Sequence, residues 1–160
     1  MAVDMFLKIE GIKGEAQDSK HKDEIDVLAW SWGMSQSGTT HMGPGGGAGK
    51  VNVQDISVTK YLDNASPNLM LYCCNGKHIK EMNLTVRKAG ETPLEYLKIK
   101  MENGLVSSVS TGGSGGEDRL TENVTLNFQK VHVQYFKQKD DGSGEAGPEL
   151  KWDIAKNESA

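Results

Sequence analysis

The chain has 160 residues, of which 36% are hydrophobic and 19 are glycine, and it carries a formal net charge of -4. This length suits one domain with its own buried core. The slight acidic excess argues against a nucleic-acid partner, which requires a basic surface. The N-terminal residues lack the basic segment and apolar run of a secretory signal peptide. No segment is long and apolar enough for stable membrane insertion.

Two adjacent cysteines, Cys73 and Cys74, are the only thiols in the sequence. Neighbouring cysteines cannot form an unstrained disulfide bond with each other, because the separation and direction of their side chains are wrong. The sequence therefore indicates a protein that folds in a reducing cytoplasm.

Alternating apolar residues predict β-strands along most of the chain, beginning with Met5, Leu7 and Ile9. The next strand is expected within residues 25–35, where two opposite faces differ in size. Small side chains form one face at Ala29, Ser31 and Gly33, whereas the other face carries Trp30 and Trp32. The tryptophans are expected to pack against the core.

The alternation changes phase by one residue within two longer segments, 51–61 and 120–136. Such a change is typical of a β-bulge or of a bend at which a strand passes from one sheet to another. Two such changes favour a barrel or an orthogonal sandwich over a flat sheet. Further strands are predicted at 79–88, 94–102, 104–111 and 150–156.

One short helix is predicted between these strands. Ser66 is a suitable N-cap, Pro67 fits the first helical position, and residues 68–74 complete two turns. Gly76 follows where a left-handed C-cap residue is expected.

Glycine is concentrated in two loops, 36–50 and 110–117, that resemble known functional loops. Gly49-Lys50 is similar to the end of a phosphate-binding loop, but a strand is predicted to follow it where that motif requires a helix. Ser114 lies between glycines, as in the nucleophile elbow of hydrolases, but again no helix is predicted after it. We therefore assign no catalytic residue and predict that the protein is not an enzyme.

Histidines are scattered at positions 21, 41, 78 and 132, without the spacing of a metal site, so neither a metal nor another cofactor is predicted. What remains is a sheet with a small-residue face and long glycine-rich loops, features that suit contact between copies of the chain. Two alternatives to such a self-assembling protein remain. Trp30 and Trp32 could bind a carbohydrate or peptide in a β-sandwich module, and Ser114 could act in a hydrolase.

Several blocks of sequence resemble the Hcp family, the haemolysin co-regulated proteins of bacterial type VI secretion systems. The resemblance runs through residues 26–38, 45–55 and 66–70 and is strongest at 106–128, in the order found in the family. It is weaker in segments 12–23, 77–103 and 135–160.

The resemblance implies a mainly β fold, in which two sheets form a β-barrel with one short α-helix on its side. It implies one Hcp-like domain over residues 1–160, without the C-terminal toxin domain of some members. The chain is then a structural tube subunit that forms stacking hexameric rings and carries effector proteins in its lumen. Further partners would be the sheath and spike of the secretion apparatus. The protein would be made in the bacterial cytoplasm and secreted without a signal peptide.

Two groups of residues follow as candidate sites. The small face is expected to line the lumen and to contact effectors through Ala29, Ser31 and Gly33. The 36–50 loop is the expected arm that reaches a neighbouring subunit or ring, with its centre at Met42, Gly43, Pro44, Gly45, Gly46, Gly47, Ala48, Gly49 and Lys50.

Overall fold

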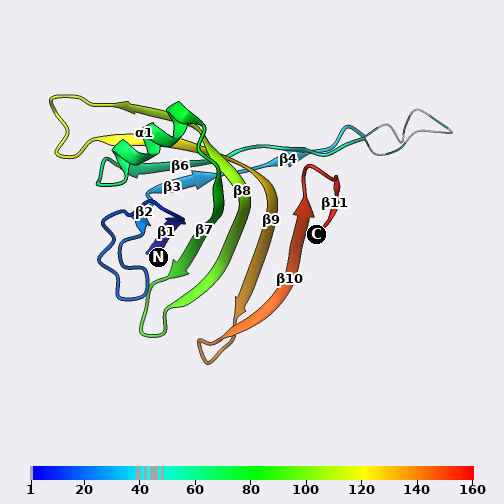
Figure 1. Ribbon diagram of the computed structural model, residues 1–160. Coiled ribbons are helices and arrows are strands. Elements are labelled where there is room, and N and C mark those ends of the chain that lie inside the picture. The colour runs from blue at the N-terminus through cyan, green and yellow to red at the C-terminus, as the bar shows by residue number, and fades with distance from the viewer. Residues whose placement is uncertain (1, 39–40, 42, 44–46, 48) are drawn as a thin grey trace.

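The computed structural model describes residues 2–38, 41, 43, 47 and 49–160. Within these residues, antiparallel strands and one helix, α1 (Ser66–Asn75), form the molecule (Figure 1). The expected mainly β fold with one short helix is therefore confirmed. The strands are β1 (Val3–Ile9), β2 (Ile25–Asp26), β3 (Ala29–Ser31), β4 (Met34–Ser35), β5 (Asn52–Val53), β6 (Ile56–Tyr61), β7 (Ile79–Lys88), β8 (Leu94–Gly112), β9 (Thr121–Gln138), β10 (Gly144–Asp153) and β11 (Glu158–Ser159).

Segment 25–31 links strand β1 on one side of it with strand β6 on the other. At its start β2 pairs with β1, and at its end β3 pairs with β6. Between them, Val27 N donates to Met5 O at 3.0 Å and Leu28 N donates to Thr59 O at 2.8 Å. Since β6 pairs with β9, and β9, β8, β7 and β1 pair in turn, the hydrogen bonds complete a circuit. This circuit is the expected barrel.

Strand β9 bends so that its two halves pair with different neighbours. Residues 121–126 pair with β6, whereas residues 130–138 pair with β10. The buried series Val124, Leu126 and Phe128 gives way to Val131 at this bend. The predicted change of phase in this segment is thus confirmed as a corner of the sheet.

The prediction of separate strands at 94–102 and 104–111 is wrong, because β8 runs without interruption through the same corner. Asn103 adopts a left-handed backbone conformation with φ 54°. At Gly104, an added Cβ would lie 2.4 Å from Asn127 O and 2.6 Å from Met82 Cε. Glycine therefore lets the backbones of β8 and β9 approach closely as they bend together.

The phase change in segment 51–61 has a different cause. Residues 52–53 form β5, which pairs with β4 outside the main sheet, whereas β6 begins at Ile56 inside it. Of the two predicted alternatives, the structure shows a bend between sheets and not a bulge.

Helix α1 ends as predicted, with Gly76 in the left-handed conformation at φ 63°. Its predicted start is off by one residue, since Ala65 is the N-cap and Ser66 is the first helical residue. The Ser66 hydroxyl is used elsewhere. It accepts a hydrogen bond from Asp63 N at 3.0 Å and donates one to Glu122 Oε1 at 2.6 Å.

A buried ionic network under this helix joins three elements of the fold. Lys60 on β6 has no exposed surface, and Glu122 on β9 is 1% exposed. The Lys60 ammonium contacts Glu122 Oε1, Asp63 Oδ1 at 2.9 Å and Ser66 Oγ at 3.2 Å. Its three hydrogens therefore match three acceptors, and the network fixes the start of α1 on the barrel.

We predict that Lys60→Met lowers the free energy of unfolding by about 3–5 kcal/mol, because it leaves two buried carboxylates without their cation. Melting at fixed protein concentration measures the effect. The exposed ion pairs of Lys100 provide the control, since Lys100→Met is expected to cost at most about 1 kcal/mol. Equal effects of the two substitutions would contradict the structural role of the buried network.

Candidate functional site

A two-stranded ribbon projects from the barrel and carries the predicted arm (Figure 1). Its strands pair through Met34 with Val53 and Ser35 with Asn52. At the base of the ribbon, Trp32 Nε1 donates to Gln54 O at 2.8 Å, and Gln54 N donates to Gly33 O at 2.9 Å. These bonds fix the direction in which the ribbon leaves the barrel.

Only part of the predicted arm lies within the described residues. Gly43, Gly49 and Lys50 are placed beyond the ribbon strands, as is Gly47. An added Cβ at Gly49 would lie 2.5 Å from Ser37 Oγ, so the two sides of the arm come close there. The other predicted arm residues lie outside the described residues: Met42, Pro44, Gly45, Gly46 and Ala48.

An apolar hollow of about 180 Å³ lies where the ribbon meets the barrel. The ribbon contributes Trp32, Met34 and Val53 to its lining, whereas the barrel contributes Val131, Leu150 and Trp152. Sequence reasoning missed this hollow because its residues come from distant segments. Their apolar character was visible in the sequence, but their proximity depends on the corner of β9.

The small face predicted on β3 is exposed at Ala29 and Ser31 and is wider than expected. Gly33 lies past the end of β3, at the base of the arm, where an added Cβ would be 3.1 Å from Gln54 Oε1.

The cross-strand pairs extend the small face over three further strands. Ala29 lies opposite Thr59 and Ser31 opposite Ser57 on β6. The same rows continue to Asn123 and Thr125 on β9 and then to Ser110 and Ser108 on β8. We call this set the hydroxyl face: Ala29, Ser31, Ser57, Thr59, Ser108, Ser110, Asn123 and Thr125.

Hydrogen bonds within the hydroxyl face hold several of its side chains in place. Thr59 Oγ1 donates to Asn123 Oδ1 at 2.7 Å, and the hydroxyls of Ser108 and Thr125 lie 2.6 Å apart. These short side chains carry no formal charge themselves, and the Asp55 carboxylate adjoins them. It accepts a hydrogen bond from Ser107 Oγ, which lies 2.6 Å from Thr125 Oγ1.

Trp30 and Trp32 lie on the other side of this segment and pack against the core, as predicted. Both indoles remain partly exposed. The rings of Trp32 and Phe128 are 6.1 Å apart at 55°. This packing leaves the tryptophans in the wall of the barrel and at the base of the arm, and gives no support to a stacking platform for sugars.

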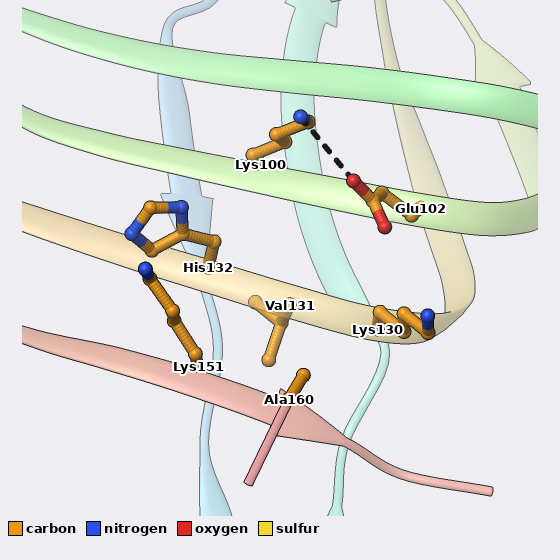
Figure 2. A pocket seen from close by; sticks show the side chains of 7 residues that line it. All are labelled: Lys100, Glu102, Lys130, Val131, His132, Lys151 and Ala160. Atoms are coloured by element: carbon orange, nitrogen blue, oxygen red, sulfur yellow. Dashed lines mark ion pairs between the residues drawn. The ribbon is translucent and has the colours of Figure 1, made fainter.

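A second hollow, of about 130 Å³, lies over β8, β9 and β10 (Figure 2). Lys100, Lys130 and Lys151 contribute positive charge beside His132, but acidic neighbours balance much of it. Hydrogen bonds that Lys100 donates to Glu102 and Glu81 raise the pKa of Lys100, and hydrogen bonds from Gln134 and His132 lower the pKa of Glu149. Most of these charges are thus engaged in surface ion pairs, which contribute little binding energy, and we assign no ligand to this hollow.

The two loops whose sequences resemble catalytic motifs are each followed by a strand, as predicted. Ser114 lies in the turn between β8 and β9, and Lys50 leads into β5, so neither precedes a helix. Among the described residues, no group of His, Cys, Asp and Glu side chains has the arrangement of a metal site. No helix in the described part of the chain could cross a membrane.

The barrel, helix α1 and the projecting ribbon define a mainly β protein with an extended arm, and its similarity to known proteins shows the family. The model of a family described as "Type VI secretion system effector, Hcp" matches residues 6–135. The chain belongs to this family, whose members are structural tube proteins of a secretion system. Segments 12–23 and 77–103, where the resemblance is weaker, lie wholly inside this match.

Individual relatives agree over their whole length. Protein Hcp1 of Pseudomonas aeruginosa strain PAO1 is 64% identical over 162 residues, covering 100% of both chains. The crystal structure of Hcp1 from Salmonella typhimurium is 42% identical, covers 100% of both chains and superposes with a TM-score of 0.81. A structure described as a type six secretion system protein has a TM-score of 0.93 at 27% identity and covers 99% of this chain and 100% of its own.

For the wall of the barrel, we predict that Trp30→Ala lowers the free energy of unfolding by about 1–3 kcal/mol. This is less than the roughly 3–5 kcal/mol of a fully buried tryptophan, because the indole is only partly buried. Thermal melting measures the loss, with Leu71→Ala as control, since Leu71 is 54% exposed. An unchanged melting temperature in Trp30→Ala would place the indole outside the packed wall.

Proposed function

We propose that this protein is the repeating subunit of a secretion tube, in which copies close into hexameric rings, the rings stack, and effector proteins travel in the channel. The observation that supports this proposal most directly is that one barrel has both a projecting ribbon and a broad hydroxyl face. The ribbon supplies a contact that reaches another subunit. The face supplies a wall past which cargo can move.

The ribbon supports assembly because it has no core of its own. A two-stranded ribbon is at best marginally stable in water unless it packs against something else. Met34, at the start of the ribbon, is 47% exposed, and Trp32 and Val53 beside it line the apolar hollow. A ring requires one surface of each subunit to meet a different surface of the next, and a projecting arm provides such a surface.

The hydroxyl face supports the role of channel wall. Ala29 and Ser31 would line the lumen together with the residues beside them on β6, β9 and β8. Their side chains are short, so they leave the channel open, and hydroxyl groups bond weakly to many polypeptide surfaces. Gly33, at the base of the arm, would contribute to subunit contact instead of cargo contact.

The remaining partners follow from the same proposal. The outer surface of a stacked tube would face the sheath, and one end would meet the spike. In this proposal the protein is a structural carrier without catalytic activity, is made in the bacterial cytoplasm and leaves the cell with its cargo through the type VI apparatus.

Removing residues 42–49 is expected to leave the barrel folded but to prevent stacking and secretion, because the arm loses its reach. Circular dichroism, electron microscopy of rings and a secretion assay measure the three outcomes. Replacing the same residues by a Gly-Ser segment of equal length shows whether the length of the arm or the identity of its side chains is required for stacking. Normal secretion by the deletion variant would show that the arm is dispensable.

Ser31→Gln is expected to preserve rings and melting temperature but to reduce export of at least one effector, because the longer side chain projects into the channel. Ser57→Gln tests the wider face in the same way, since Ser57 lies opposite Ser31. Ser159→Gln on β11 is the control, as this exposed serine lies off the hydroxyl face. If both substitutions on the face export every effector normally, the assignment of this face to the lumen is wrong.

A further inference from the structure

The connection between β1 and β2, residues 10–24, folds partly upon itself. Gly14 N donates to Asp23 O at 2.8 Å, and Ala16 N donates to Glu24 O at 2.9 Å. Side chains then join this β1–β2 loop to the barrel. Its strongest attachments are made by Asp18 and His21, neither of which was identified as functional from the sequence.

His21 lies between two carboxylates. Its Nδ1 is 2.9 Å from Glu24 Oε2 on the same loop, and its Nε2 is 2.6 Å from Glu95 Oε1 on β8. The residue is only 8% exposed. Its ring stacks on Phe6 of β1, with centroids 4.4 Å apart and an angle of 10° between planes. The imidazole is therefore fixed in position, with both nitrogens directed at acceptors.

This geometry selects one protonation state. An ionised carboxylate only accepts hydrogen bonds, and a neutral imidazole has a single N–H to donate. The ring satisfies both partners only when both nitrogens carry a proton, which makes it a cation. Burial alone would raise the pKa of Glu95, but hydrogen bonding and charge from His21, with help from Lys98, lower it overall. Glu95 is therefore ionised at neutral pH.

The charges around the ring also favour the cation. Asp18 and Glu24 approach from the loop, Glu95 and Lys98 from β8, Arg87 from β7 and Asp4 from β1. These are four carboxylates against two cations, so a proton on His21 reduces the negative excess of the cluster.

A second attachment of the loop, between Asp18 and Arg87, depends less on the protonation of His21. The Arg87 guanidinium binds Asp18 at 2.7 and 3.0 Å and Asp4 at 3.1 Å, and it lies 5.1 Å from the centroid of the Phe6 ring. Hydrogen bonding by Arg87 holds the pKa of Asp18 well below its usual range. This pair stays charged at any ordinary pH. It therefore tethers the middle of the loop while His21 titrates.

We propose that His21 is a proton-dependent latch, which holds the β1–β2 loop against β8 when both ring nitrogens are protonated and releases it when one proton is lost. After that loss, one ring nitrogen faces a carboxylate with no hydrogen between them, and two acceptors repel each other at close range. The loop then opens around its remaining tether at Arg87. This inference is independent of the proposed role in a tube.

The sign of the pH dependence follows. The latch stabilises the closed loop while both ring nitrogens are protonated. The backbone amides of the loop are therefore protected from hydrogen exchange at acidic pH, and this protection is lost when a rise in pH removes one ring proton. On the far acidic side, protonation of Glu95 also removes this stabilisation. Because the pKa of Glu95 is lowered from its ordinary value of 4.5, Glu95 contributes to this loss only at a pH below the range in which an ordinary glutamate titrates.

Hydrogen exchange of the whole chain in solution between pH 5.5 and 9 tests the latch, after correction for intrinsic exchange rates. We expect protection of peptides covering residues 12–24 to fall about tenfold as the pH rises, because local opening controls their exchange. Peptides from the centre of β8 are expected to keep their protection. A flat profile for residues 12–24 in the wild type would overturn the proposal.

Three variants separate the latch from simple loosening of the fold. His21→Gln is expected to give low protection at every pH, and Glu95→Gln is expected to move the loss of protection to lower pH, since one charge that holds the proton is gone. His132→Gln is the matched control, because His132 pairs with Glu149 at the surface. A wild-type pH profile in either His21→Gln or Glu95→Gln would contradict the proposal.

Discussion

Strand β9 is the element on which the rest of this fold depends, because its two halves pair with different strands. Its first half closes the barrel against β6, and its second half carries β10 and the C-terminal residues. The corner between the halves requires the neighbouring strand β8 to bend as well, and glycine at position 104 makes that possible. Both candidate surfaces then follow: the hydroxyl face lies across the first half, and the apolar hollow lies beside the second.

The buried charges have a complementary role at the other end of the barrel. Lys60, Glu122 and Asp63 cost desolvation energy, and their mutual contacts offset that cost only while all three remain paired. Here it fixes where α1 begins relative to β6 and β9. The helix therefore sits in one position over the barrel, while the opposite side of the same strands remains available as a smooth surface.

Much of this fold could be predicted from the sequence, because alternation along a strand depends only on neighbouring residues. The phase changes at 51–61 and 120–136, the packing of Trp30 and the left-handed Gly76 were all visible in that local pattern. The uninterrupted passage of β8 through Gly104 was not, since a glycine that allows close approach looks the same as one that ends a strand. Ser66 was misplaced as N-cap because its hydroxyl bonds to Glu122, which lies far away in sequence.

The candidate site was harder to predict, since it depends on register between strands. Ala29 and Ser31 could be singled out, but Ser57, Thr125 and Ser108 join them only through pairing across β6, β9 and β8. His21 gave no signal, because its two carboxylate partners include Glu95 from a distant strand. Family membership rests on the agreement of sequence over residues 6–135, whereas the orientation of the hydroxyl face in an assembly is an inference from the shape and chemistry of one chain.

The most direct test of this account is electron microscopy of the purified protein at a resolution that traces the chain. We predict closed rings of six subunits, with Ala29 and Ser31 on the inner wall and the β4–β5 ribbon in contact with another subunit. A protein that remains monomeric at high concentration, or rings whose hydroxyl face points outward, would contradict it.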